Sequence, residues 1–140
     1  IMPSLVGSEM CIRDRNNNAS ESQTYTTQLG VYTKIGNRVF VSGTLTMNSL
    51  GSLDTTCVPR IQGLPFNTIG CASNETSIYL GYATSLSITA GNYVSGYTVL
   101  GGSYFSMQKW SVTGGTSNLT IAEWSDGGGI QFALNYKTAS

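Results

Sequence analysis

The sequence predicts an all-β fold, an antiparallel β-sandwich or jelly roll of about eight strands. Three observations indicate this class. Apolar and polar residues alternate with a period of two along most of the chain, as they do in a half-buried strand. No window shows the 3.6-residue period of a helix. Glycine-rich turns separate the alternating segments at short intervals. The 140 residues fit one domain, which we place at residues 24–140.

The clearest local signal is a hairpin. Residues 25–35 and 38–47 read as strands, with an interruption expected near Gly30. Gly36-Asn37 between them tolerates the positive φ of a two-residue turn. In residues 38–47 the odd positions are mostly apolar and the even positions polar, with Phe40 as the exception. Gly43 interrupts the apolar face and marks either a bulge or a close approach.

Shorter strands are expected along the rest of the chain, and glycines punctuate them as turns. In the last strand, alternate residues from Ile130 to Tyr136 share one face, and Gln131, Ala133, Asn135 and Lys137 occupy the other. The expected strands are residues 57–64, 77–83, 93–100, 104–112, 118–124 and 130–136, and the expected turns are residues 101–102, 114–115 and 127–129.

The first 23 residues differ from the remainder. Four charged residues crowd into residues 9–15 of an otherwise charge-poor chain, and residues 16–23 are a polar linker. Residues 4–15 resemble the peptide obtained when a sequencing-adapter read is translated, a string that precedes unrelated metagenomic proteins. We therefore expect residues 1–23 to be a non-native or disordered leader outside the fold.

The composition excludes several function classes. Only 10% of the residues are charged, the net charge is zero and histidine is absent, whereas about 25% of an ordinary domain is charged. Without a basic stripe, nucleic acid is not an expected partner. No apolar run approaches the about 18 residues of a membrane helix, so membrane insertion is not expected. No C-x-x-C pair supports a metal, and no cofactor is implied.

Acid–base chemistry has few candidates. Without histidine there is no Ser-His-Asp or Cys-His arrangement. The closest acidic pair, Glu123 and Asp126, flanks Trp124 before Gly127-Gly-Gly129. These carboxylates form either an acid pair beside an aromatic platform or two solvated charges at a turn, and the second is the ordinary case. We expect no catalytic residue and no enzymatic activity.

Aromatic residues are the better functional lead, because rings with apolar faces and polar tips suit sugar or protein contacts. Four of them lie close to glycine-rich turns, where loops carry function on a rigid scaffold. We predict these four as ligand-binding residues, with core packing or a subunit contact as the alternative for each. They are Tyr97, Tyr104, Trp110 and Trp124.

Three segments carry a family resemblance: residues 32–46 (YTKIGNRVFVSGTLT), residues 61–66 (IQGLPF) and residues 130–138 (IQFALNYKT), with Gly81-Tyr82 between the last two. In this order they resemble the C-terminal domain of tail-fibre and related structural proteins of marine bacteriophages, over about residues 30–139. The resemblance implies a small β domain at the distal end of a fibre, usually a homotrimer. It implies contact with a host-surface glycan or protein, or with another virion protein, and no catalytic residues.

That family implies a virion component assembled in the reducing bacterial cytoplasm, which favours free thiols at Cys57 and Cys71. The sequence alone leaves open whether these two cysteines form a disulfide or are small buried residues. The alternative function is a stand-alone carbohydrate-binding module of a bacterial secreted protein. A trimer would distinguish the first function from the second.

Overall fold

A computed structural model describes residues 4–6, 11–13, 22–69, 76–111 and 113–139. Almost all regular structure in these residues is antiparallel β, which confirms the predicted class. The elements are β1 (Ser4–Val6), β2 (Cys11–Arg13), β3 (Thr24–Ile35), β4 (Arg38–Ser49), β5 (Arg60–Gln62), β6 (Ser77–Leu86), β7 (Tyr93–Thr98), β8 (Tyr104–Ser111), β9 (Gly115–Asn118), the 3-10 turn η1 (Ile121–Glu123) and β10 (Trp124–Lys137).

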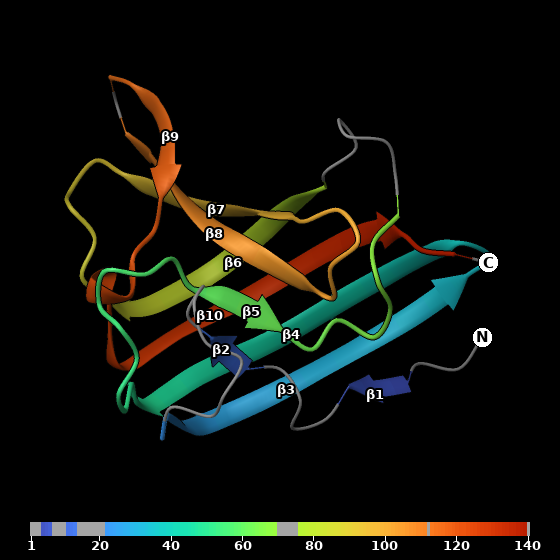
Figure 1. Ribbon diagram of the computed structural model, residues 1–140, viewed down its shortest axis with the longest axis horizontal. Helices are drawn as coiled ribbons and strands as arrows, with labels where there is room; N and C mark the ends of the chain where they lie inside the picture. The colour runs from blue at the N-terminus through green and yellow to red at the C-terminus, as the bar shows by residue number, and fades with distance from the viewer. Residues whose placement is uncertain (1–3, 7–10, 14–21, 70–75, 112, 140) are drawn as a thin grey trace.

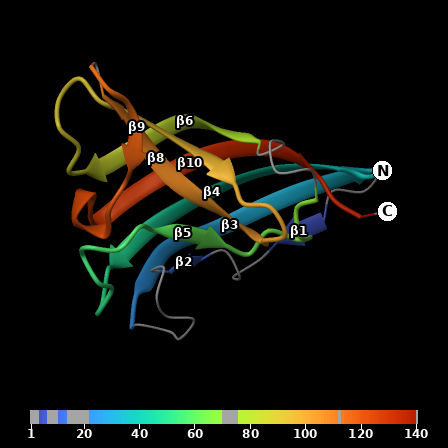
Figure 2. The same ribbon diagram turned by 45° about the horizontal axis from the view of Figure 1, so that its top comes forward.

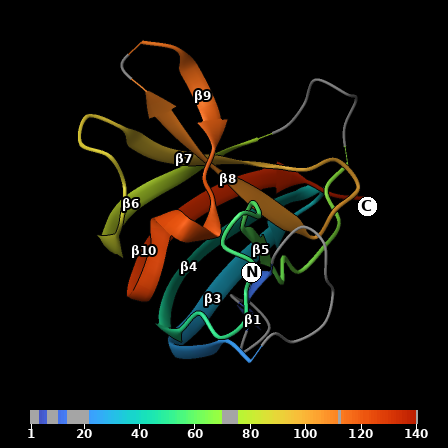
Figure 3. The same cartoon turned by 60° about the vertical axis from the view of Figure 1, so that its left-hand side comes forward.

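The strands form one curled sheet in the order β1-β3-β4-β10-β6-β7-β8-β5-β2, with β9 paired to β8. Strand β6 pairs with both β10 and β7, so the sheet folds over at this strand. We call β3, β4, β10 and β6 the first layer, and β7, β8, β5 and β9 the second layer. Figures 1 and 3 show β8 and β5 lying across the longer strands of the first layer. The predicted sandwich is therefore confirmed, with eight strands after residue 23.

The core lies between the two layers. Alternate residues of β4 and β10 point inward, among them Val41, Leu45 and Leu134, which are buried as the alternation predicts. The second layer contributes Phe105, whose ring centroid lies 5.0 Å from that of Phe132. Burying each such side chain stabilises the fold by about 1.5–3 kcal/mol. Packing between the layers thus fixes which faces of the sheet remain outside.

Glycine meets a backbone requirement at two places in the β3–β4 hairpin. Gly36 adopts a φ of 59° in the predicted turn, a conformation that glycine reaches without strain. Gly43 is a close approach and not a bulge, because the pairing of β4 with β3 and β10 runs through it without a shift. An added Cβ there would lie 2.7 Å from both the Leu29 carbonyl oxygen and the Phe132 ring.

Several predicted boundaries are wrong. Strand β3 is continuous through Gly30, which pairs with Gly43. The segment 57–64 is a strand only over Arg60–Gln62. The segment 118–124 is not a strand, because β9 ends at Asn118 and η1 follows. Residues 127–129 lie inside β10 and not in a turn, because Gly129 pairs with β4 and β6, with a register shift before it on the β6 side.

The three segments that carry the family resemblance meet at one end of the sandwich. The Tyr32 and Phe66 rings pack edge to face with centroids 5.6 Å apart, and Lys34 Nζ lies 4.7 Å from the Phe66 ring centroid. The Phe66 N–H donates to the Tyr136 hydroxyl at 3.3 Å. Burial raises the pKa of Tyr136 to about 12. These motifs therefore form a single structural unit that joins β3, the β5–β6 connection and β10.

Part of the predicted leader packs on the domain. Strand β1 pairs with β3, and β2 pairs with β5 (Figure 2). Ile12 is fully buried in the core, and its N–H donates to the Tyr25 hydroxyl at 2.8 Å. The expectation that this segment makes no core contact therefore does not hold at Ile12. The boundary at residue 23 and the foreign origin of residues 4–15 stay predictions.

Deletion of residues 1–15 is expected to lower the melting temperature by about 8–20 °C. Loss of a buried isoleucine side chain costs about 2–5 kcal/mol, and about 1 kcal/mol corresponds to roughly 4 °C in a domain of this size. Differential scanning calorimetry of the full and shortened chains measures the shift. An unchanged melting temperature would return the segment to the dispensable leader that the sequence predicts.

Candidate functional site

The outer face of the second layer carries most of the predicted ligand-binding residues. On β8, Phe105 and Met107 are fully buried and point inward, so the even-numbered residues between Tyr104 and Trp110 point outward. The register continues this face onto β7, where Tyr93 pairs with Trp110 and Tyr97 pairs with Ser106. Two strands thus place four aromatic side chains on one surface.

One end of this surface lies on the β8–β9 hairpin, which projects beyond the rest of the sandwich in Figures 1 and 3. Tyr93 is 72% exposed and Trp110 is 50% exposed. The Trp110 Nε1–H donates to Ser95 Oγ at 3.0 Å, which holds the indole in place. Strand β9 adds Asn118 next to Gln108. Fixed rings bordered by amides are suited to stacking and hydrogen bonding with sugars.

The other end of this surface is a hollow of about 290 Å³. The Arg60 guanidinium lies 4.6 Å from the Tyr104 ring centroid, in cation–π contact. Tyr97, Tyr104 and Asn118 line the hollow with Arg60. We define the aromatic face as Arg60, Tyr93, Tyr97, Tyr104, Gln108, Trp110 and Asn118.

Three of the four predicted residues, Tyr97, Tyr104 and Trp110, therefore come together, and their role in ligand binding stays a prediction. Trp124 does not join them. It is 2% exposed, and its Nε1–H donates to the Gly128 carbonyl oxygen at 3.1 Å. Core packing, the alternative given above, applies to Trp124, because β10 turns its side chain between the layers.

Four members of the aromatic face were not predicted: Arg60, Tyr93, Gln108 and Asn118. Tyr93 begins the alternation that contains Tyr97, so the period-2 pattern could have placed it on the same face. Arg60 has no such signal, because its position beside Tyr104 depends on the pairing of β5 with β8. Pairing between strands that are distant in sequence cannot be derived from local alternation.

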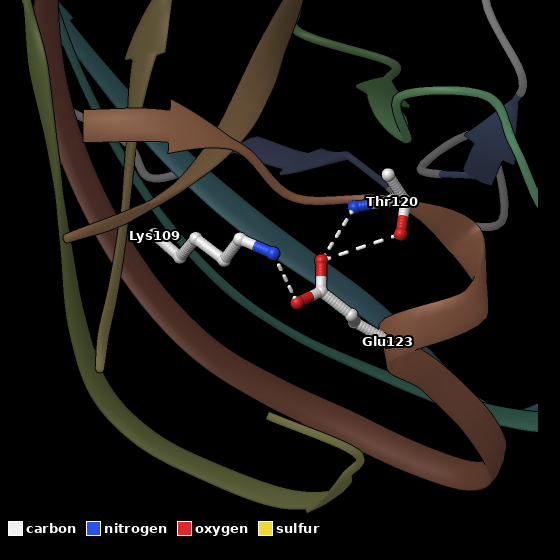
Figure 4. Close-up of polar contacts among 3 residues, drawn as sticks. All are labelled: Lys109, Thr120 and Glu123. Atoms are coloured by element: carbon white, nitrogen blue, oxygen red, sulfur yellow. Dashed lines mark hydrogen bonds and ion pairs between the residues drawn. The ribbon is translucent and has the colours of Figure 1, made fainter. Parts of the chain in front are cut away.

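The two acidic residues singled out in the sequence bind different partners. Glu123 forms an ion pair with Lys109, and its other oxygen accepts from the Thr120 N–H at 3.0 Å and the Thr120 hydroxyl at 3.3 Å (Figure 4). Asp126 accepts from the Leu50 N–H at 2.8 Å. The two carboxylates therefore have separate local roles, and Glu123 caps η1 while tying it to β8.

The electrostatics of Glu123 match this structural role. Burial raises the pKa of Glu123, but the Lys109 ammonium and the Thr120 hydrogen bonds outweigh burial and hold the pKa below its usual value.

The pKa of Asp54 is also lowered, by the N–H and hydroxyl of Thr56 and the Cys57 thiol. Among the described residues, no group of three or more acidic, histidine or cysteine side chains could hold a metal ion.

Glu123→Gln is expected to lower the free energy of unfolding at neutral pH by about 1.5–3 kcal/mol, the range for hydrogen bonds to charged groups. Because the folded-state pKa is lowered, the stabilisation is present above the unfolded-state value of about 4.3. It is lost as the pH falls through the folded-state pKa. Urea titrations of both proteins across this acid range measure the difference.

Asp126→Asn is the matched control for this measurement. Asp126 is exposed, and an asparagine oxygen can still accept from the Leu50 N–H. Its change should stay within about 0.5 kcal/mol, as for most surface substitutions. A Glu123→Gln loss no larger than this control, or a loss that persists unchanged in acid, would contradict the role given to the ion pair.

Cys57 is buried, and its thiol donates to Asp54 Oδ2 at 3.5 Å. Cys71 lies outside the described residues, so a Cys57–Cys71 disulfide stays an open alternative.

No helix in the described part of the chain is long and apolar enough to span a membrane.

Comparison with known proteins gives one match in structure. No family model matches the chain, and no curated protein matches it significantly. The crystal structure of the Dettilon tailspike protein matches with a TM-score of 0.62 and 15% sequence identity. The match covers 98% of this chain and 23% of the tailspike chain. The chain thus shares its fold with about a quarter of a tailspike.

Proposed function

We propose that this chain is a non-catalytic, homotrimeric structural and attachment module of a phage tail. The observation that carries the proposal is the fold shared with the tailspike, which extends over 98% of the chain. The sequence resemblance to tail-fibre domains points to the same class of virion component. This domain would be made and assembled in the bacterial cytoplasm and would act at the host surface.

The aromatic face is the proposed contact with the host. Trp110 is exposed on β8, whose hairpin with β9 projects from the sandwich, and Tyr93 is exposed beside it on β7. Aromatic rings of this kind stack on the apolar faces of sugars. Gln108 and Asn118 can both donate and accept hydrogen bonds to sugar hydroxyls. Arg60 at the hollow favours glycans that carry carboxylate or sulfate groups, because a guanidinium binds such anions in two-point contacts.

A glycan array probed with the purified chain tests this contact. Trp110→Ala should reduce the signal at least tenfold while the circular dichroism spectrum is retained. The matched control is Ile69→Ala, which removes an exposed apolar side chain from the β5–β6 connection, outside the aromatic face, and should leave the glycan signal unchanged. Equal binding by the wild-type chain and Trp110→Ala would reject the aromatic face as the receptor contact.

The second candidate function is a stand-alone carbohydrate-binding module of a bacterial secreted protein. The same aromatic face favours it, since a single copy presents the complete surface. The two functions differ in assembly: the tail module requires a trimer, whereas the stand-alone module is a monomer. The mass of the purified chain in solution separates them.

A further inference from the structure

The outer face of the first layer is apolar and has no partner within the described chain. Because Val41 and Leu134 point inward and side chains alternate along a strand, their neighbours Phe40, Ser42 and Ala133 point outward. Six of the ten large hydrophobic side chains exposed in the described residues lie on this face. They are Leu29, Val31, Ile35, Phe40, Tyr79 and Tyr82.

The register arranges this face in rows that cross the strands. The first row contains Thr33, Phe40 and Asn135; the second contains Val31, Ser42, Ala133 and Tyr79; the third contains Leu29, Thr44, Gln131 and Tyr82. Two hollows of about 330 and 250 Å³ lie along these rows. Tyr79 borders the larger hollow and is 65% exposed, so it is available to enter a neighbouring molecule.

Charged side chains are confined to one end of this face. None of the three rows contains a charged side chain. Arg38 and Lys137 stand together in the next row, beyond Phe40 and Asn135. Arg38 Nη1 donates to Asn135 Oδ1 at 3.1 Å, which directs it along the end of the face. The three rows are thus neutral, and the two cations lie at one end of the face, where Ile35 pairs with Arg38.

This distribution favours identical copies as the occupant. When a threefold axis runs along the strands, each row lies at one height and converges on the same row of the other two copies. Any charge in a row would then meet its own kind, and like charges at an interface cost several kcal/mol. A foreign partner imposes no such restriction, since it can supply complementary charges. Hydroxyl and amide groups donate and accept equally well, so Ser42, Thr44 and Gln131 can hydrogen-bond to their own copies.

We propose that the outer face of the first layer packs against two further copies of this chain around a threefold axis. The inference rests on the homotrimer proposed above and names the surface that forms it. Phe40, Tyr79 and Tyr82 supply the aromatic contacts that dominate interface energies. The aromatic face of the second layer then points away from the axis and stays accessible.

Charge insertion tests the surface. Ala133 is exposed in the second row, so Ala133→Glu places a carboxylate there without entering the core. Thr116→Glu is the matched control, because it adds the same charge at an exposed position on the second layer. In light scattering at micromolar concentration, the wild-type chain and Thr116→Glu should be trimers and Ala133→Glu a monomer with an unchanged circular dichroism spectrum.

If Ala133→Glu does not fold, site-specific photo-crosslinking tests the same surface. p-Benzoyl-phenylalanine in place of Phe40 should give covalent dimers and trimers on irradiation, and in place of Tyr93 it should give none. A trimeric wild-type chain whose Phe40 position gives no crosslinks, or a folded Ala133→Glu trimer, would overturn this surface and leave the trimer intact. A monomeric wild-type chain would overturn the proposed trimer itself.

Discussion

Trp124→Ala is expected to lower the free energy of unfolding by about 3–5 kcal/mol, the range for removing a large aromatic side chain from a core. Trp124 is 2% exposed, and the ring packs where β10 follows η1. Its loss opens a cavity and leaves the Gly128 carbonyl oxygen without the indole N–H that it accepts at 3.1 Å. Urea unfolding followed by circular dichroism measures the change.

Trp110→Ala is the matched control, because the same substitution at a half-exposed position should cost about 1 kcal/mol or less. Trp110 contributes one exposed hydrogen bond to Ser95 and little buried surface. We therefore expect Trp124→Ala to reduce stability and Trp110→Ala to reduce glycan binding. Equal losses at both positions would contradict the assignment of Trp124 to the core and Trp110 to the surface.

Gly43→Ala is expected to lower the free energy of unfolding by about 3 kcal/mol, at the upper end of the usual cost of overpacking. The new Cβ would lie 2.7 Å from the Leu29 carbonyl oxygen and from the Phe132 ring. Strand β4 is held between β3 and β10, so neither neighbour can withdraw without breaking the sheet register. Thermal and urea unfolding of the purified variant measure the loss.

Gly81→Ala provides the comparison for this substitution. An added Cβ at Gly81 meets nothing within 4 Å, and the residue does not have a positive φ. Its change should remain within about 0.5 kcal/mol. If Gly43→Ala is as stable as Gly81→Ala, Gly43 is not packed closely against β3 and the Phe132 ring.

The sequence predicts the fold best where one face of a strand is buried. The alternation in β4 and β10 places Val41 and Leu134 inside correctly, because period 2 directly encodes which side meets the core. Phe40 breaks the pattern and lies 47% exposed on the outer face. The one exception in that strand thus marks the surface now proposed for self-association.

Prediction is poorer where distant pairing overrides local signals. Gly127-Gly-Gly129 reads as a turn, yet these residues lie in β10, with Gly129 between β4 and β6. The glycines next to Trp124 predict a ligand-binding position, but its side chain is buried in the core. Proximity to glycine-rich turns selects Tyr97, Tyr104 and Trp110, which lie on one outer face, and their role in ligand binding stays a prediction. Arg60 joins them solely through the pairing of β5 with β8.

The two outer faces of the sandwich differ in character, which supports a division of roles. The first layer presents a neutral apolar face suited to identical copies, and the second presents aromatic rings, amides and Arg60 suited to a glycan. A trimer built on the first face carries three copies of the second, so weak binding at each copy is strengthened by multivalency. In the proposed tail module, attachment depends on assembly and on these exposed rings.

The mass of the purified wild-type chain in solution tests the central claim most directly. Size-exclusion chromatography with multi-angle light scattering should give three times the 14.9 kDa chain mass at micromolar concentration. A stable species at the mass of one chain would contradict the homotrimeric tail module.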